Sequence, residues 1–152
     1  MRKLWIAASV LLALLVGAQL VPVTRTNPAI EADVAAAPEI DALLRRACYD
    51  CHSRETAWPW YSRVAPVSWL VVHDVAEGRR ELDFSAWGAY DARQRAKKLR
   101  ESADEIAEGE MPPWYYRLVH RDARLTAAER EAPRVWCVAE IARAADGGMV
   151  TR

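Results

Sequence analysis

The sequence contains only one phenylalanine and six glycines, and it has no excess of charge of either sign. Its 21 Lys and Arg residues balance 21 Asp and Glu residues, so the formal net charge at pH 7 is zero. Proteins that bind nucleic acid through its phosphates usually carry an excess of positive charge. The composition therefore argues against a nucleic-acid partner. The chain also lacks the alternating strands and the Gly-rich connections that a βαβ unit needs.

Cysteine is scarce as well, with three in the chain, but two of the three lie in one short motif, Cys48-Tyr49-Asp50-Cys51-His52. Two thiols three positions apart, followed directly by a histidine, form the attachment pattern of a c-type haem. Each thiol adds to one haem vinyl group, and this spacing lets both reach one porphyrin edge from a single helical turn. His52 then lies under the ring as the proximal iron ligand. The motif predicts one covalently bound haem c per chain.

Two other interpretations of Cys-x-x-Cys remain open at this point. A thioredoxin-like redox dithiol would place the pair in a βαβ unit, for which the sequence gives no pattern. A structural zinc site would need a second Cys or His pair at similar spacing, whereas Cys137, His73 and His120 each stand alone. Cys137 is expected to be a buried, inert cysteine, with pairing to another chain as the alternative.

The N-terminus carries a basic pair followed by a long apolar run. Arg2 and Lys3 precede Leu4–Val23, and about twenty apolar residues are enough to cross the hydrocarbon core of a membrane. We expect a retained signal anchor with its N-terminus in the cytoplasm. The small residues Val16-Gly17-Ala18 leave a cleaved signal peptide as the alternative. In either case the rest of the chain is expected on the periplasmic side of a bacterial inner membrane, where c-type haem is attached.

Composition divides the chain into four parts. Residues 1–23 are expected to form the signal anchor or signal peptide, and residues 24–38, rich in Pro and Ala, a tether. Residues 39–145 are expected to form one haem-binding domain, and residues 146–152 a flexible tail.

Helical signals begin just before the cysteine motif. Apolar residues recur at helical spacing from Pro38 or Glu39 up to Cys48, so we expect the first helix to lead into the motif. A second helix is expected to begin near Pro66 and to end near Gly78.

Capping patterns mark two later helices. Asp91 with Gln94, and Thr126 with Glu129, have the spacing of capping boxes, and Gly109 is expected to end the first of these helices. The closing helix should pack against the first. Pro133 lies inside the closing helix and is expected to kink it or to delay its start.

A second candidate iron ligand follows the helix that Gly109 ends. Met111 stands before Pro112 and Pro113, and two prolines restrict the backbone that positions its thioether. Its distance in sequence from His52 leaves room for two helices around the haem edge. We therefore expect Met111 to be the distal ligand, with a core-filling methionine as the alternative. Met149 lies in the Gly-rich tail and is a weaker candidate for the distal ligand.

Several other side chains are candidates for the haem pocket. Trp58, Trp60 and Tyr61 surround Pro59 in an expected loop, and Trp114 follows the prolines; their rings suit the walls of a porphyrin pocket. Two arginines, Arg54 and Arg63, are expected to be solvated, with pairing to a propionate as the alternative. Two lone histidines complete the set: His73, the weaker candidate for distal ligand, is expected in the core, and His120 on the surface.

Six segments together resemble one known family, the bacterial haem-binding domain family of small monohaem c-type proteins. The segments are Cys48–Ser53, Trp58–Ser62, Ala65–Trp69, Gly78-Arg79 with Leu82–Ser85, Gly109–Tyr115 and the Arg25–Pro28 tether. The likeness extends from about Arg25 to Ala142, and Pro133 is its one departure. Membership implies covalent haem, a periplasmic domain and usually an N-terminal anchor. It implies no settled reaction.

These observations predict an all-α, cytochrome c-like domain that encloses one haem. With His52 and Met111 on the iron, substrate cannot reach the metal, and the expected function is electron transfer between iron(III) and iron(II) rather than catalysis. The expected partners are periplasmic or membrane redox proteins. The alternative is a haem-based sensor of small ligands, or a peroxidase-like enzyme, in which Met111 binds weakly.

Overall fold

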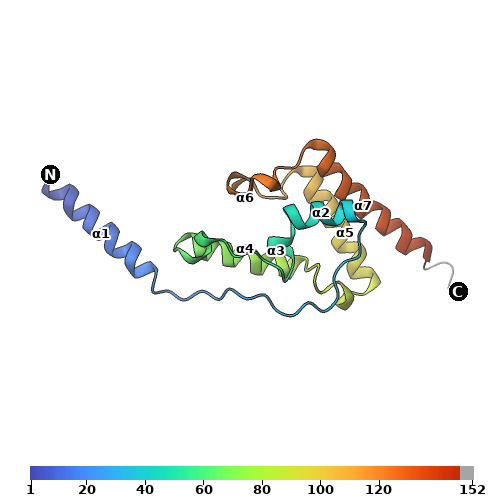
Figure 1. Cartoon of the computed structure of the whole chain (residues 1–152), viewed down its shortest axis with the longest axis horizontal. Coiled ribbons are helices and arrows are strands. Elements are labelled where there is room, and N and C mark those ends of the chain that lie inside the picture. Colours follow the sequence, from blue (N-terminus) through green and yellow to red (C-terminus); the bar gives the residue numbers. More distant parts are fainter. Residues whose placement is uncertain (148–152) are drawn as a thin grey trace.

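The computed structural model describes residues 1–147 of the chain (Figure 1), so Met149 and the greater part of the expected tail lie outside the described residues. The described chain contains seven α-helices, three short 3-10 helices and no named strand, which confirms the predicted all-α class. The elements are α1 (Arg2–Ala18), α2 (Pro38–Ala47), α3 (Tyr49–His52), η1 (Trp60–Arg63), α4 (Val67–Glu81), η2 (Trp87–Ala89), α5 (Ala92–Glu108), α6 (Trp114–Val119), η3 (Arg121–Ala123) and α7 (Ala127–Gly147).

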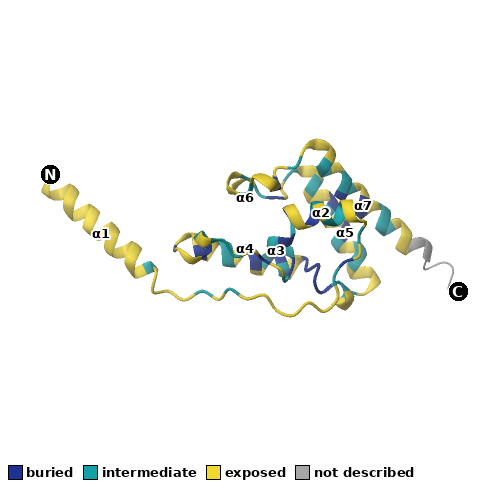
Figure 2. Cartoon of the chain, viewed as in Figure 1, coloured by how far each residue is buried: buried dark blue, intermediate teal, exposed yellow. Residues whose placement is uncertain are grey.

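Helix α1 stands away from the other helices at one end of the molecule (Figure 1). None of its residues is buried, and it is drawn almost wholly as exposed in Figure 2. Its end meets the rest of the chain through the side-chain amide of Gln19, which donates to Ala65 O and accepts from Ala65 N. No helix within residues 1–147 is both long enough and apolar enough to span a membrane.

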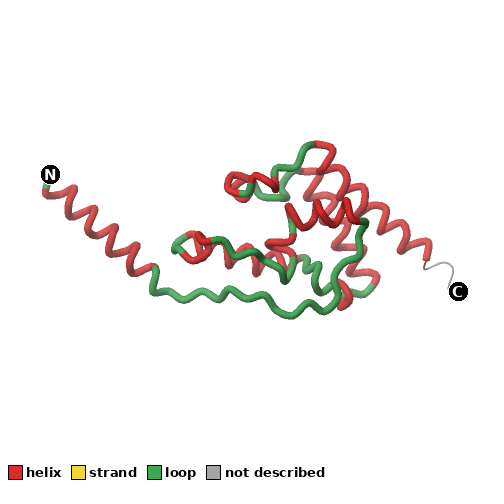
Figure 3. The backbone as a smooth tube through the Cα atoms, in the orientation of Figure 1, coloured by secondary structure: helices red, strands yellow, loops and turns green. Residues whose placement is uncertain are grey.

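The segment between α1 and α2 is an extended loop that follows the body of the protein (Figure 3). The expected tether is held at several points. Val34 is buried and its amide donates to Phe84 O at 3.1 Å. Arg54 donates to Ala29 O at 2.6 Å, and Arg79 donates to Thr26 O at 2.8 Å. These bonds attach the segment to the residues around the cysteine motif.

Helix α2 delivers the motif as expected. It begins at Pro38, which suits the first turn because this position needs no N–H donor. Glu39 and Asp41 lie in its first turn and Arg45 and Arg46 in its last, so the charges complement the helix dipole at both ends. The helix breaks at Cys48, where φ is −123°, and α3 then carries the remainder of the motif.

The core lies where α5, α7 and α2 meet (Figure 1). Its buried members are Val34, Leu44, Tyr49, Leu82, Phe84, Leu99, Ala103, Trp136 and Cys137. Helix α7 packs chiefly along α5 and also meets α2, so the expected contact with the first helix of the domain is the smaller of the two.

Both predicted capping boxes are confirmed. The Asp91 carboxylate accepts from Gln94 N at 2.7 Å while the Gln94 side chain accepts from Asp91 N at 2.9 Å. Thr126 and Glu129 make the equivalent pair of bonds before α7. Gly109 ends α5 in the left-handed conformation, with φ of 78°, which favours glycine.

One predicted boundary was wrong, and one of the two alternatives for Pro133 is excluded. Helix α4 continues past Gly78 to Glu81, because Gly78 serves a close packing contact inside the helix rather than a helix end. Helix α7 already begins at Ala127, so Pro133 does not delay its start. Pro133 is the seventh residue of α7, and the helix continues beyond it.

The close contact at Gly78 generates a stability prediction. A Cβ atom at this position would lie 2.5 Å from the backbone oxygen of Cys51, and neither backbone can move without shifting α3 against α4. Gly78→Ala should therefore lower the free energy of unfolding by about 1–3 kcal/mol, the usual cost of overpacking. Denaturant unfolding measures this change.

Gly17→Ala is the matched control, because a Cβ at Gly17 meets nothing within 4 Å. It should leave the free energy of unfolding of the domain unchanged. Equal stability of the two variants would contradict the packing argument.

Candidate functional site

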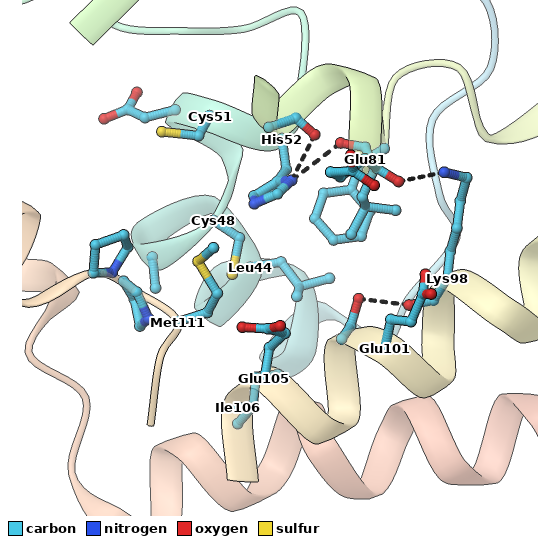
Figure 4. A pocket seen from close by; sticks show the side chains of 18 of the residues that line it. Leu44, Cys48, Cys51, His52, Glu81, Lys98, Glu101, Glu105, Ile106 and Met111 are labelled. Carbon is cyan, nitrogen blue, oxygen red and sulfur yellow. Dashed lines mark hydrogen bonds between the residues drawn. The ribbon is translucent and has the colours of Figure 1, made fainter. Parts of the chain in front are cut away.

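A cavity of about 470 Å³ opens between α2, α3, α4, α5 and the loop before α6 (Figure 4). Its size falls within the roughly 300–1,000 Å³ that ligand and cofactor pockets occupy. Apolar side chains form much of its wall: Leu44, Leu82, Phe84, Leu99, Ile106 and Trp136. A flat apolar group with a polar edge suits such a wall.

Cys48 and Cys51 both line this cavity, and both are free thiols. Burial raises the pKa of each thiol to about 12. The two groups are therefore protonated at neutral pH. The break at Cys48 between α2 and α3 places the two cysteines on consecutive short elements.

The imidazole of His52 points into the same cavity (Figure 4). Its Nδ1 atom lies 2.9 Å from Gly78 O and 3.1 Å from Leu82 O. Since a carbonyl oxygen only accepts hydrogen bonds, Nδ1 carries the proton and Nε2 keeps its lone pair. Burial lowers the pKa of His52 and favours the neutral ring. A neutral imidazole held through its second nitrogen is the form that binds a metal ion.

The backbone around His52 is held by α4 and by the segment that follows it. Phe84 N donates to His52 O at 2.8 Å, and Arg79 Nε donates to Ser53 O at 2.7 Å. Ser53 is fully buried and its hydroxyl donates to Tyr49 O. The motif is therefore fixed from both sides of the histidine.

Met111 lines the cavity from a different segment, the loop between α5 and α6. Figure 4 shows its side chain directed inward beside Cys48. The loop turns sharply after Gly109, and the amides of Glu110 and Met111 both donate to Glu105 O, at 3.1 and 3.3 Å. His52 and Met111 therefore face one cavity from separate elements, as two axial ligands must.

The four predicted aromatic residues, Trp58, Trp60, Tyr61 and Trp114, lie outside the cavity wall. Trp60 and Trp114 are 76% and 67% exposed. Trp58 donates from Nε1 to Asn27 at 3.2 Å, and the Tyr61 hydroxyl hydrogen-bonds to His120 Nε2.

The cavity takes its aromatic lining instead from Phe84, Tyr115, Tyr116 and Trp136. Tyr115 and Tyr116 directly follow the Met-Pro-Pro segment, and this adjacency was the available signal for them. Trp136, on α7, belongs both to the buried core and to the cavity wall.

The remaining candidates fall into different surroundings. His73 lies on the exposed face of α4 and not on the cavity, so the expectation of a core histidine was wrong. His120 is half-buried rather than on the open surface, and its ring stacks on Tyr116 with centroids 4.0 Å apart. Arg54 is engaged by Asp83 and Glu31, and Arg63 is exposed.

Cys137 is buried, as expected, with 2% of its surface exposed, and it also lines the cavity. In the described part of the chain, no group of three or more His, Cys, Asp or Glu side chains is arranged to hold a metal ion by itself. The cavity therefore offers the thiols of the Cys48 and Cys51 pair, the separate Cys137 thiol, one neutral imidazole and one thioether around an apolar space. This set fits a haem, which brings its own four equatorial nitrogen ligands.

Comparison with known proteins gives one match. A family model described as "Haem-binding domain" matches residues 13–139, which include the whole cavity. No curated protein and no solved structure matches the chain.

Burial of Cys137 leads to a prediction about its reactivity. The thiolate is the reactive form, and a pKa raised to about 12 leaves on the order of one thiolate in ten thousand at pH 8. In the folded protein this thiol should resist alkylation at pH 8. Its reactivity should rise as the pH approaches 12 or when denaturant unfolds the chain.

Mass spectrometry of the alkylated protein, with and without denaturant, measures this difference. Rapid modification of Cys137 in the native protein at pH 8 would show that the thiol is not enclosed as described.

Proposed function

The chain belongs to the haem-binding domain family, and from this premise we propose that it is an exported monohaem c-type protein that carries electrons. The proposal depends above all on one observation. Cys48, Cys51 and His52 line a single cavity of about 470 Å³, and the imidazole is held in the tautomer that leaves Nε2 available.

In this proposal each residue of the motif has a separate role. Cys48 and Cys51 would hold the haem through two thioether bonds at one edge, and His52 Nε2 would bind the iron from one face. Met111 would bind it from the other face. The bound group would supply one-electron cycling between iron(III) and iron(II), and a thioether ligand raises its potential relative to a second histidine.

The chain's own residues would keep the group in an apolar setting. Leu44, Leu99 and Trp136 exclude water from the inner wall, and Phe84 lies with its ring 6.5 Å from the ring of His52. A low-polarity surrounding disfavours the charged ferric form and so supports a carrier that is readily reduced.

Lys98 is the candidate for contact with a propionate. Among the described residues that line the cavity it is the one Lys or Arg, and Figure 4 shows it at the end away from the two cysteines. Vinyl groups and propionates occupy opposite edges of a haem. Attachment at Cys48 and Cys51 would therefore turn the propionates toward Lys98.

We also propose that the domain works on the periplasmic side of a bacterial membrane, with a periplasmic or membrane redox protein as its partner. The basic pair Arg2-Lys3 before the apolar run Leu4–Val23 supports export.

The role of Met111 gives the experiment that tests the proposed function. Met111→Ala should remove the near-infrared charge-transfer band of a methionine bound to ferric iron, and it should lower the reduction potential. The ferrous variant should bind carbon monoxide at once, with a shift of the Soret band, whereas the wild-type protein should not.

Met149→Ala is the control, because Met149 is the remaining methionine of the sequence after Met1 and Met111, and its removal should change none of these signals. Prompt binding of carbon monoxide by the wild-type protein would contradict the carrier function and favour a sensor or a peroxidase-like enzyme. An unchanged near-infrared band in Met111→Ala would mean that another residue is the distal ligand.

A further inference from the structure

Helix α6 covers one side of the cavity and buries little apolar surface. It follows the Met-Pro-Pro segment directly, and none of its six residues is buried. Trp114, Leu118 and Val119 are 67%, 62% and 63% exposed. Since hydrophobic stabilisation is proportional to the apolar area removed from water, packing alone holds this helix weakly.

Two consecutive tyrosines connect α6 to two different walls of the cavity. The hydroxyl of Tyr116 donates to Asp50 at 2.7 Å, and the hydroxyl of Tyr115 donates to Asp74 at 3.1 Å. Asp50 lies on α3 between the two cysteines, and Asp74 lies on α4. All four side chains line the cavity.

The Tyr116 bond is the better protected of the two. Tyr116 is half-buried, and its ring stacks on His120 at an interplanar angle of 11°. Burial also raises the pKa of Tyr116, so its hydroxyl keeps the proton that it donates. Tyr115 is 37% exposed, and its bond is longer. A hydrogen bond to a carboxylate is stronger than one between neutral groups.

We propose that Tyr115 and Tyr116 are positioning residues, which hold α6 to α3 and α4 and thereby keep Met111 aimed at the iron. The inference rests on the proposed function, because it takes Met111 as the distal ligand. Three residues, Pro112, Pro113 and Trp114, separate Met111 from Tyr115. The prolines leave the backbone little freedom, so fixing the two tyrosines also fixes the position of Met111. When the two tyrosine–aspartate hydrogen bonds break, α6 can move and Met111 can leave the iron.

The matched variants are Tyr116→Phe, Tyr115→Phe and the double variant, each of which removes a hydroxyl and keeps the ring. The rate of carbon monoxide binding to the ferrous protein reports the population in which Met111 is detached. Loss of one bond to a carboxylate changes such a population by about tenfold. We expect about a tenfold faster rate for Tyr116→Phe, a smaller rise for Tyr115→Phe, and a rise in the double variant that exceeds tenfold and equals the product of the two single effects. The near-infrared band should weaken in the same order.

Three further measurements separate positioning from general stability. Tyr90→Phe is the control, because its hydroxyl accepts from Asp83 N and lies outside the cavity wall. Asp50→Asn keeps one neutral oxygen acceptor for Tyr116 and should raise the rate less than Tyr116→Phe does, whereas Asp50→Ala removes the acceptor and should raise the rate at least as much as Tyr116→Phe. Trypsin cleavage after Arg117, within α6, should accelerate in the double variant.

The outcomes are distinct from those that test the proposed function. Suppose that the wild-type protein has the methionine band and that the double variant has the same rate and cleavage as Tyr90→Phe. This result would overturn the positioning role of the two tyrosines and leave the distal role of Met111 standing. A wild-type protein without that band would overturn both the distal role of Met111 and the positioning role drawn from it. A faster rate in every variant, with Tyr90→Phe included, would also overturn the inference, because a general loss of stability would then explain it.

Discussion

The contact between the motif helix and α4 is the constraint on which the site depends. His52 reaches across to Gly78 O and Leu82 O, and the backbones approach so closely that a Cβ at Gly78 would lie 2.5 Å from Cys51 O. One bond pattern thus determines the tautomer of His52, the direction of its ring and the place of Cys51. Without this contact the motif would be a short helical turn with no fixed partner.

The rest of the molecule completes the cavity around that contact. Helices α5 and α7 pack on each other and supply the inner apolar wall, while the loop after Gly109 brings Met111 to the open side. The inner wall is held by burial, and the outer wall is held by single polar bonds from Tyr115 and Tyr116. This division places the proposed proximal ligand on the rigid part of the site and the proposed distal ligand on the part with fewer contacts.

Features encoded by local chemistry could be predicted from the sequence. The capping boxes at Asp91 and Thr126 and the left-handed Gly109 involve neighbouring residues only, and all three are present. The cavity lining depends on contacts between distant segments, and aromatic content alone did not identify it. Trp60 is 76% exposed while Ser62, two positions later, is fully buried, so in this segment the small polar residue faces inward. Gly78 was predicted to lie near a helix end for the same reason. Its role is a close contact with Cys51, which lies 27 positions earlier in the sequence.

The central claim is that the thiols of Cys48 and Cys51 hold one haem covalently, with His52 as a ligand of its iron. The most direct measurement is the intact mass, under denaturing conditions, of the chain produced together with a c-type haem attachment system. The account predicts the mass of the polypeptide plus one haem, with the added mass on the peptide that contains Cys48 and Cys51. A coloured protein that loses its haem on denaturation would contradict covalent attachment, and a colourless protein with the mass of the bare chain would contradict the whole account.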